Sequence, residues 1–161
     1  MRILLALVTL LLLVCDAYSR SAYCRFLNTR TSNIRGRITF FQPNAGAPTR
    51  VRARIRGLAP NSRHDVDISQ RADFSNGCAS TGGQFRDLRD LVADGRGRAE
   101  YRYTTDAIDL FGSSSIIGKA CSIRATASGT SRKIRCSRVN QGVLRDDTDG
   151  TDGTPGTDGI D

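Results

Sequence analysis

With 161 residues, the chain is long enough for one domain with a hydrophobic core and too short for two such domains. Its formal net charge of +8 comes almost entirely from arginine, because Lys119 and Lys133 are its only lysines. Arginine stays charged at any working pH and binds carboxylates, sulfates and phosphates through a planar fork, although a basic composition also serves solubility alone.

Residues 1–19 have the pattern of a secretory signal peptide. One positive charge, Arg2, precedes an apolar run over 3–14. That run is shorter than the ~20 apolar residues that span a bilayer, and Ala17 and Ser19 are small residues suited to cleavage after Ser19. We therefore expect a secreted, extracellular protein with no membrane segment after cleavage.

Residues 20–145 have the periodicity of short strands separated by turns. Arginines alternate with apolar or small residues over 35–40, 50–56 and 96–103. This period of two is typical of strands with one wet and one buried face. Turn-forming residues separate the runs, and the pattern predicts an all-β sandwich or barrel with no helix.

Cysteine usage predicts two disulfides. Cys15 lies in the expected leader, so the mature chain keeps Cys24, Cys78, Cys121 and Cys136. An even number in an oxidising compartment favours disulfides, but the spacing leaves all three pairings open. A zinc site is the alternative, and it is disfavoured because the chain has no C-x-x-C pair and a single histidine, His64.

Residues 146–161 form an acidic segment unlike the rest of the chain. Its charged residues are Asp146, Asp147, Asp149, Asp152, Asp158 and Asp161. Glycine at every third position gives a collagen-like register, but four triplets are too few for a triple helix alone. The composition predicts a disordered tail that folds back on the basic body or modulates its partners. Weak calcium binding by its carboxylates is a further alternative, although no EF-hand pattern is present.

Several segments between Cys24 and Val143 carry a family pattern. Residues 77–85 match G-C-x-S-x-G-x-H-F at every fixed position except the histidine, and 115–119 match S-I-I-G-R except at the last residue. These segments resemble the copper/zinc superoxide dismutase family. The resemblance implies an eight-stranded Greek-key barrel with shortened zinc and electrostatic loops. It also implies a Cys78–Cys136 disulfide, which leaves Cys24 and Cys121 as inward-facing partners of a second.

The resemblance also identifies ligands that this chain lacks. The family's chemistry needs copper held by four imidazoles, one of which bridges to zinc. The four matching positions here hold, in chain order, Asp67, Ser69, Gln84 and Arg124. Asp87 matches a zinc-ligand position but has no histidine partners, and His64 matches a structural position. We therefore expect no metal cofactor and no catalytic residue; residual metal binding or superoxide dismutase activity is the alternative.

Arg124 places a permanent positive charge where the family holds copper, so cation binding there is disfavoured. Asp67 is the residue that can neutralise this charge. We predict an Asp67–Arg124 salt bridge, with Ser69 and Gln84 as hydrogen-bond partners. Lys133 matches the family's substrate-guiding arginine, but without copper it has nothing to guide.

The alternating arginines predict one positive face. In the family's barrel they fall on one sheet, remote from the metal site, with Arg35, Arg37, Arg50, Arg52, Arg54, Arg56, Arg98 and Arg102 outward. Such crowding needs a compensating reason, and an acidic or sulfated extracellular polymer is the simplest partner. Nucleic acid is not favoured, because no aromatic residues alternate with these arginines. The alternative is neutralisation by the tail or by counterions alone, and a homodimer is left open.

Overall fold

The computed structural model describes residues 18–127 and 130–142. The acidic tail and all but the last two residues of the expected leader lie outside these ranges. Within them, no helix is long and apolar enough to cross a membrane.

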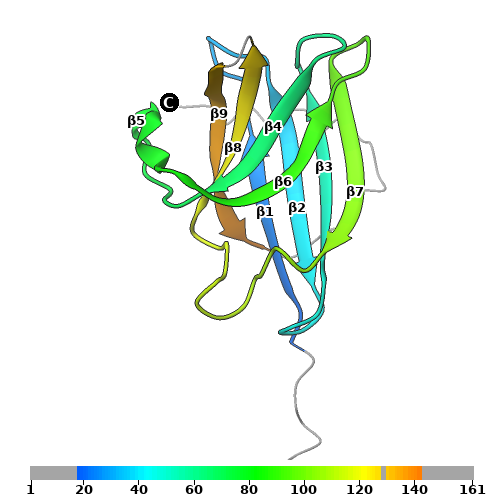
Figure 1. Ribbon diagram of the computed structural model, residues 1–161, viewed down its shortest axis with the longest axis vertical. Coiled ribbons are helices and arrows are strands. Elements are labelled where there is room, and N and C mark those ends of the chain that lie inside the picture. Colours follow the sequence, from blue (N-terminus) through cyan, green and yellow to red (C-terminus); the bar gives the residue numbers. More distant parts are fainter. Residues whose placement is uncertain (1–17, 128–129, 143–161) are drawn as a thin grey trace, which may run out of the picture.

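Eight antiparallel strands form one sheet that curls into a nearly closed barrel (Figure 1). In chain order they are β1 (Arg20–Phe26), β2 (Arg35–Gln42), β3 (Thr49–Arg56), β4 (Arg63–Ser69), β6 (Gln84–Val92), β7 (Arg98–Thr105), β8 (Ala120–Ala127) and β9 (Thr130–Gln141). Their order across the sheet is β6-β4-β8-β9-β1-β2-β3-β7. The prediction of an eight-stranded all-β barrel is confirmed.

The connection between β4 and β6 adds two short elements to the barrel. The strand β5 (Ser75–Cys78) runs into a single turn of 3-10 helix, η1 (Ala79–Thr81). Figure 1 shows this connection projecting beside β8 and β9. It therefore lies on the half of the barrel that contains β4, β8 and β9.

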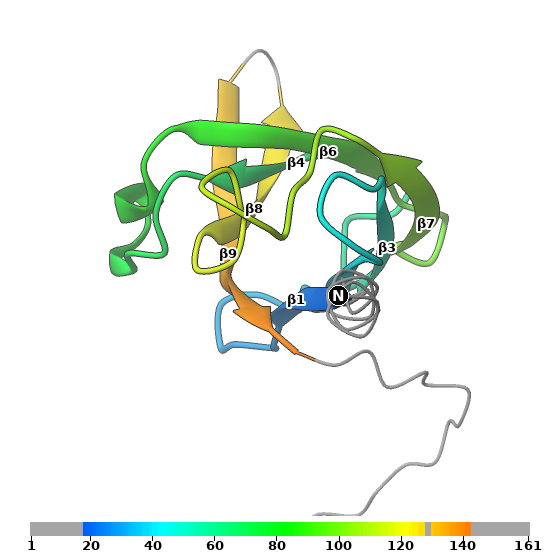
Figure 2. The same ribbon diagram turned by 90° about the horizontal axis from the view of Figure 1, so that it is seen from below.

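Period-two patterning explains the inner wall of the other half. Ile38 and Phe40 of β2 lie opposite Ala53 and Val51 of β3, and all four are completely buried. The intervening arginines point outward because successive side chains in a strand alternate between faces. Figure 2 shows β1 and β3 on one side of the barrel and β4, β8 and β9 on the other.

Two glycines make a close crossing at one end of the barrel possible. Gly57 (φ +79°) and Gly97 (φ +68°) have left-handed backbone conformations. A Cβ at Gly57 would lie 2.1 Å from the Asn33 carbonyl oxygen, and one at Gly97 would lie 2.2 Å from that of Leu58. The Leu58 N–H donates to the Gly97 carbonyl oxygen at 3.1 Å, which fastens the β3–β4 turn to the start of β7.

Both disulfides that the family resemblance implies are present. Cys24 of β1 bonds Cys121 of β8, and both residues are completely buried inside the barrel. This bond joins the strands on either side of β9. Cys78 bonds Cys136 of β9 and ties the β5–η1 connection to the barrel wall.

Candidate functional site

The positions that match copper ligands hold an ion pair on the outer side of β4 and β8. Arg124 Nε lies 2.7 Å from Asp67 Oδ2, and Arg124 Nη2 lies 2.5 Å from the same oxygen. The side chain of Asp67 is 2% exposed and that of Arg124 is 22% exposed. The predicted Asp67–Arg124 salt bridge is therefore present and mostly withdrawn from solvent.

Hydroxyl groups and a lysine extend this ion pair. Ser69 Oγ donates to Asp67 Oδ1 at 3.3 Å and lies 2.7 Å from Ser122 Oγ. Lys133 Nζ donates to Ser69 Oγ at 2.8 Å, to Thr81 Oγ1 at 2.7 Å and to the Gly82 carbonyl oxygen at 2.6 Å. We call this set the polar cluster; it consists of Asp67, Ser69, Thr81, Ser122, Arg124 and Lys133.

Within the polar cluster, Lys133 links β9 to β4 and to the β4–β6 connection, a role that was not predicted from the sequence. From β9 its ammonium group reaches Ser69 of β4, Thr81 at the end of η1 and Gly82 directly after it. Burial lowers the pKa of Lys133, the charge of Asp67 opposes that shift, and the charge of Arg124 adds to it. Together with the Cys78–Cys136 bond, Lys133 fixes the β4–β6 connection against the barrel.

Gln84 and Asp87 do not belong to the polar cluster. Gln84 lies opposite Ser69 in the β4–β6 register and is exposed, and no hydrogen bond within 18–127 and 130–142 joins its side chain to the cluster. The predicted hydrogen bond to Gln84 is therefore wrong. The register shifts between Ile68 and Ser69, and such a bulge re-aims neighbouring side chains. Asp87 lies opposite Asp67 but is also exposed.

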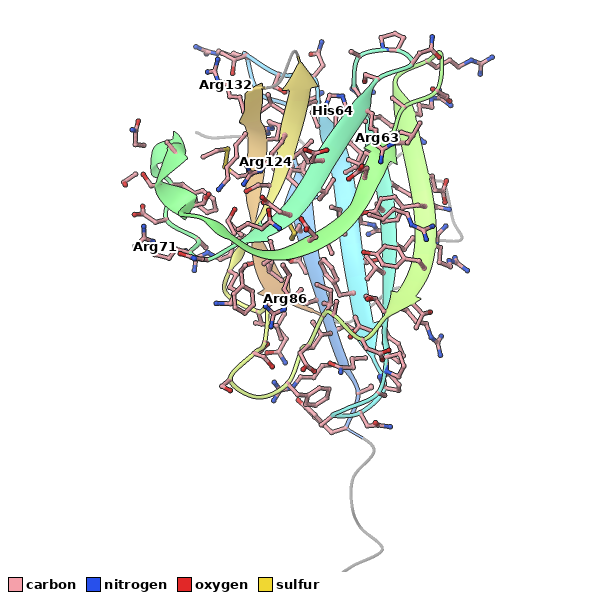
Figure 3. All side chains as sticks on the ribbon, in the orientation of Figure 1. Arg63, His64, Arg71, Arg86, Arg124 and Arg132 are labelled. Carbon is pink, nitrogen blue, oxygen red and sulfur yellow. A yellow bond between two sulfur atoms is a disulfide. The ribbon has the colours of Figure 1, made fainter. Side chains whose placement is uncertain are left out.

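His64 is a buried, hydrogen-bonded residue. Its ring is on β4, beside Arg124 of β8 (Figure 3). Nε2 lies 2.8 Å from Ser62 Oγ, and Nδ1 lies 3.2 Å from the Arg124 carbonyl oxygen. Both ring nitrogens thus have protein partners, which agrees with the structural role expected of this histidine.

The residues at this position do not fit copper or zinc. The buried carboxylate is engaged by Arg124, Lys133 adds a second cation, and the remaining groups are hydroxyls. Copper and zinc in protein sites are bound mostly by imidazole, thiolate and free carboxylate. Among residues 18–127 and 130–142, no three His, Cys, Asp or Glu side chains are grouped so that they could hold a metal ion.

Comparison with known proteins places the barrel in a family. The sequence model of copper/zinc superoxide dismutase (SODC) matches residues 34–144. The chain belongs to this family. The match includes β2 to β9 and every residue of the polar cluster. A barrel of the copper/zinc superoxide dismutase family therefore carries Arg124, Asp67 and Lys133 where the copper ligands are expected.

Individual members of the family are moderately similar to the chain. It is 29% identical to superoxide dismutase [Cu-Zn] of Neurospora crassa over 111 residues, which is 58% of this chain and 72% of that protein. It is 31% identical to superoxide dismutase [Cu-Zn] of Humicola lutea, with the same coverage of both chains. It is 33% identical to superoxide dismutase [Cu-Zn] 2 of Mesembryanthemum crystallinum, covering 58% and 70% of the two chains.

The second candidate site of this superoxide dismutase-like barrel is the outer face of β1, β2, β3 and β7, which we call the arginine face. Strand register arranges its residues in four rows. They are Arg35, Arg56 and Arg98; Arg25, Arg37, Arg54 and Glu100; Tyr23, Thr39, Arg52 and Arg102; and Ser21, Phe41, Arg50 and Thr104. The face therefore carries nine arginines and one glutamate.

Glu100 neutralises only the middle of the arginine face. It accepts from Arg54 Nε at 2.9 Å and from Arg52 Nη2 at 3.3 Å. The end row of Arg35, Arg56 and Arg98 is exposed, and none of the carboxylates in the described part of the chain forms a salt bridge with it. Because adjacent strands lie ~4.8 Å apart, these three arginine side chains project from the sheet as close neighbours.

Two features of the arginine face were not foreseen from the sequence. Arg25 belongs to it, opposite Arg37, although β1 has no run of alternating arginines that could signal this. The expectation that no aromatic residue lies among the outward arginines is wrong. Tyr23 and Phe41 occupy the same face, and the Arg50 guanidinium lies 5.2 Å from the centre of the Phe41 ring. Both residues lie outside the alternating runs on which that expectation was based.

Proposed function

We propose that this protein is a secreted, catalytically inactive member of the copper/zinc superoxide dismutase family whose arginine face binds acidic or sulfated extracellular polymers. The observation that carries the proposal is the presence of nine arginines and one glutamate on a single continuous face. Opposed like charges on neighbouring strands destabilise a sheet. A multivalent anion would remove that penalty and would pair with guanidinium forks through sulfate or carboxylate groups.

Loss of catalysis is supported by the polar cluster. Its guanidinium and ammonium groups repel a metal cation, and its carboxylate is already paired. Secretion is supported by the two disulfides, since such bonds persist in oxidising compartments. Together these features favour a barrel that serves as a scaffold for its arginine face.

Heparin chromatography tests the binding role. We would compare the salt concentration that elutes the mature chain with that for Arg35→Gln/Arg56→Gln/Arg98→Gln, which removes the end row. The native protein should be retained above physiological ionic strength. The variant should elute at lower salt, because it forms fewer cation–anion contacts with heparin and its binding therefore releases fewer counterions. Replacing the same three arginines by lysine keeps the charge and separates guanidinium recognition from charge alone.

A matched control removes three arginines away from this face. Arg30, Arg71 and Arg132 are all exposed, and Figure 3 shows Arg71 and Arg132 on the opposite side of the view from β3 and β7. Arg30 lies in the β1–β2 loop, where the Leu27 carbonyl oxygen accepts from Arg135 of β9. Their triple glutamine variant has the same net charge as the end-row variant. If both variants elute alike, retention reflects net charge and the arginine face is not a binding site.

A further inference from the structure

The anions missing from the arginine face are present elsewhere in the same chain. Against the nine arginines of this face, the described barrel offers Glu100 within the face and Asp94, which accepts from the Arg98 N–H, at its end. Six of the chain's 16 acidic residues are instead concentrated in residues 146–161, which contain no arginine or lysine. This segment and the arginine face are therefore complementary in charge.

The chain leaves the barrel at the rim of the arginine face. Gly142 follows β9, and its N–H donates to the Ser21 carbonyl oxygen at 3.0 Å. Ser21 belongs to the row of the face that also contains Phe41 and Arg50. A Cβ built on Gly142 would lie 2.6 Å from the ring of Tyr23, which is in the next row. Gly142, after which the acidic segment follows in the sequence, thus lies next to the face.

The length of the following segment matches the size of the face. The 19 residues from 143 to 161 would have a root-mean-square span of about 24 Å as a flexible glycine-rich coil. The rows follow one another along the strands, and Arg50 and Arg56, in the first and last rows, lie six positions apart, which is about 20 Å at ~3.4 Å per residue. The first aspartate, Asp146, comes only four residues after Gly142. The aspartates can therefore reach every row without leaving the surface.

Several other arginines of the barrel are already engaged by acceptors of the barrel itself. Arg63 pairs with Asp90 and Arg124 with Asp67. Further guanidinium groups donate to backbone carbonyl oxygens: Arg20 to Leu110, Arg135 to Leu27 and Arg138 to Ala72. The guanidinium groups of the end row have no such acceptor among the hydrogen bonds of the described residues, although the backbone N–H of Arg98 donates to Asp94. Unlike the exposed Arg30, Arg71 and Arg132, the three arginines of the end row lie opposite one another on adjacent strands.

We infer that residues 146–161 occupy the arginine face of their own chain and compete there with an external polyanion. The inference rests on the proposed function of that face. Tethering gives the segment an effective concentration on the order of millimolar. Its individual contacts are exposed and screened by salt, so a longer polymer with more anionic groups displaces it. The segment thereby sets a threshold of charge density below which an anion is not bound.

Paramagnetic labelling tests where the segment lies. The four cysteines of the barrel are all in disulfides, so Thr154→Cys supplies a single thiol for a nitroxide label on the mature chain. At low salt, the nitroxide should reduce the intensity of the NMR amide signals of β2, β3 and β7, which are strands of the arginine face. The signals of β4 and β8 should keep their intensity. The signals should recover in about 1 M salt, where the Debye length is ~3 Å.

The control changes the face and keeps the label. In Arg35→Gln/Arg56→Gln/Arg98→Gln the loss of intensity should shrink, and in Arg30→Gln/Arg71→Gln/Arg132→Gln it should persist. Equal loss over β4 and β8, or no loss at all, would overturn the inference. A loss that grows with protein concentration would also overturn it, because the segment would then bind a second copy.

Heparin elution separates this inference from the proposed function. Replacing the six aspartates of 146–161 by asparagine should raise the elution salt of the native face by on the order of 0.1 M. The same change should have little effect in the end-row variant. An equal rise in both backgrounds would mean that the segment acts through net charge alone, which contradicts the inference but leaves binding by the face intact. Absence of retention even with the neutralised segment would instead refute the proposed function.

Discussion

The polar cluster and the arginine face show two ways in which one barrel accommodates cations. Arg124 and Lys133 are partly buried, and each has oxygen acceptors within 2.8 Å. Arg35, Arg56 and Arg98 are exposed, and none of their guanidinium groups forms a salt bridge with a carboxylate of the described residues. A buried cation must be compensated by the fold itself, whereas an exposed one can be compensated by solvent or by a partner. Only the exposed set is therefore available for binding.

The largest effect should come from the bond that holds the two halves of the barrel together. The double variant Cys24→Ala/Cys121→Ala opens a link with a sequence separation of 97 residues and leaves a hole at two completely buried positions. We expect a loss of about 4 kcal/mol in the free energy of unfolding, measured by urea denaturation. Cys78→Ala/Cys136→Ala should cost less, since both cysteines are partly exposed. The reverse order would mean that the β5–η1 connection stabilises the barrel more than its core link does.

Breaking the polar cluster should have the next largest effect. Asp67→Asn keeps the side-chain shape but leaves the Arg124 guanidinium without its counter-charge. We expect a loss of about 3 kcal/mol, because removing one partner of a buried pair leaves an uncompensated charge. Asp90→Asn is the matched control: its pair with Arg63 is 28% and 71% exposed, so the loss should be about 0.5 kcal/mol. Equal losses in urea denaturation would contradict the contrast between buried and exposed cations.

Two tyrosines beneath the arginine face should respond in opposite directions. The hydroxyl of Tyr101 is buried and has no hydrogen-bond partner among the described residues, whereas that of Tyr103 accepts from the Arg89 N–H at 3.2 Å. Tyr101→Phe should therefore raise the free energy of unfolding by about 1 kcal/mol at neutral pH, and Tyr103→Phe should lower it by about 1 kcal/mol. Thermal denaturation of the two variants measures both changes, and a loss in Tyr101→Phe would show that the hydroxyl has a partner.

Alkaline pH adds a second readout for Tyr101. Burial raises the pKa of Tyr101 above its ordinary value of 10.0. The folded protein then keeps a proton that the unfolded chain releases, so stability falls as the pH rises above about 10. Tyr101→Phe should make that fall shallower in urea denaturation between pH 9 and 11. An unchanged slope would mean that this hydroxyl ionises equally easily in both states.

The smallest effect should have the opposite sign to that of the polar cluster. Arg56 lies between Arg35 and Arg98 in the end row, so Arg56→Gln removes a repulsion and should stabilise the protein by about 0.5 kcal/mol at low salt. The gain should vanish in high salt. Arg54→Gln should give no gain, because Arg54 pairs with Glu100. A destabilised Arg56→Gln variant would show that the end row is held by attraction rather than tolerated for binding.

Much of the arginine face could be predicted because alternation is a local property. The runs over 35–40, 50–56 and 98–103 put arginines outward and apolar residues inward wherever these strands pair. The sequence did not predict three residues of the face, Arg25, Tyr23 and Phe41. Arg25 and Tyr23 lie in a strand without a run of alternating arginines, and Phe41 lies just after such a run has ended. Their place follows from pairing of β1 with β2, which is a contact between separate segments.

The polar cluster shows the corresponding limit for a site. The loss of the copper ligands could be predicted by matching the sequence to a family pattern. The Asp67–Arg124 pair could be predicted because two of the replacements have opposite charges. The contacts of Lys133 with Ser69 and Thr81 span 64 and 52 residues along the chain, and the outward turn of Gln84 depends on a bulge in β4–β6 pairing. Residue type and period therefore dictate which face of a strand a side chain takes and which charges are present. Register, bulges and long-range pairing dictate which side chains meet, because a single shift of pairing re-aims every neighbour.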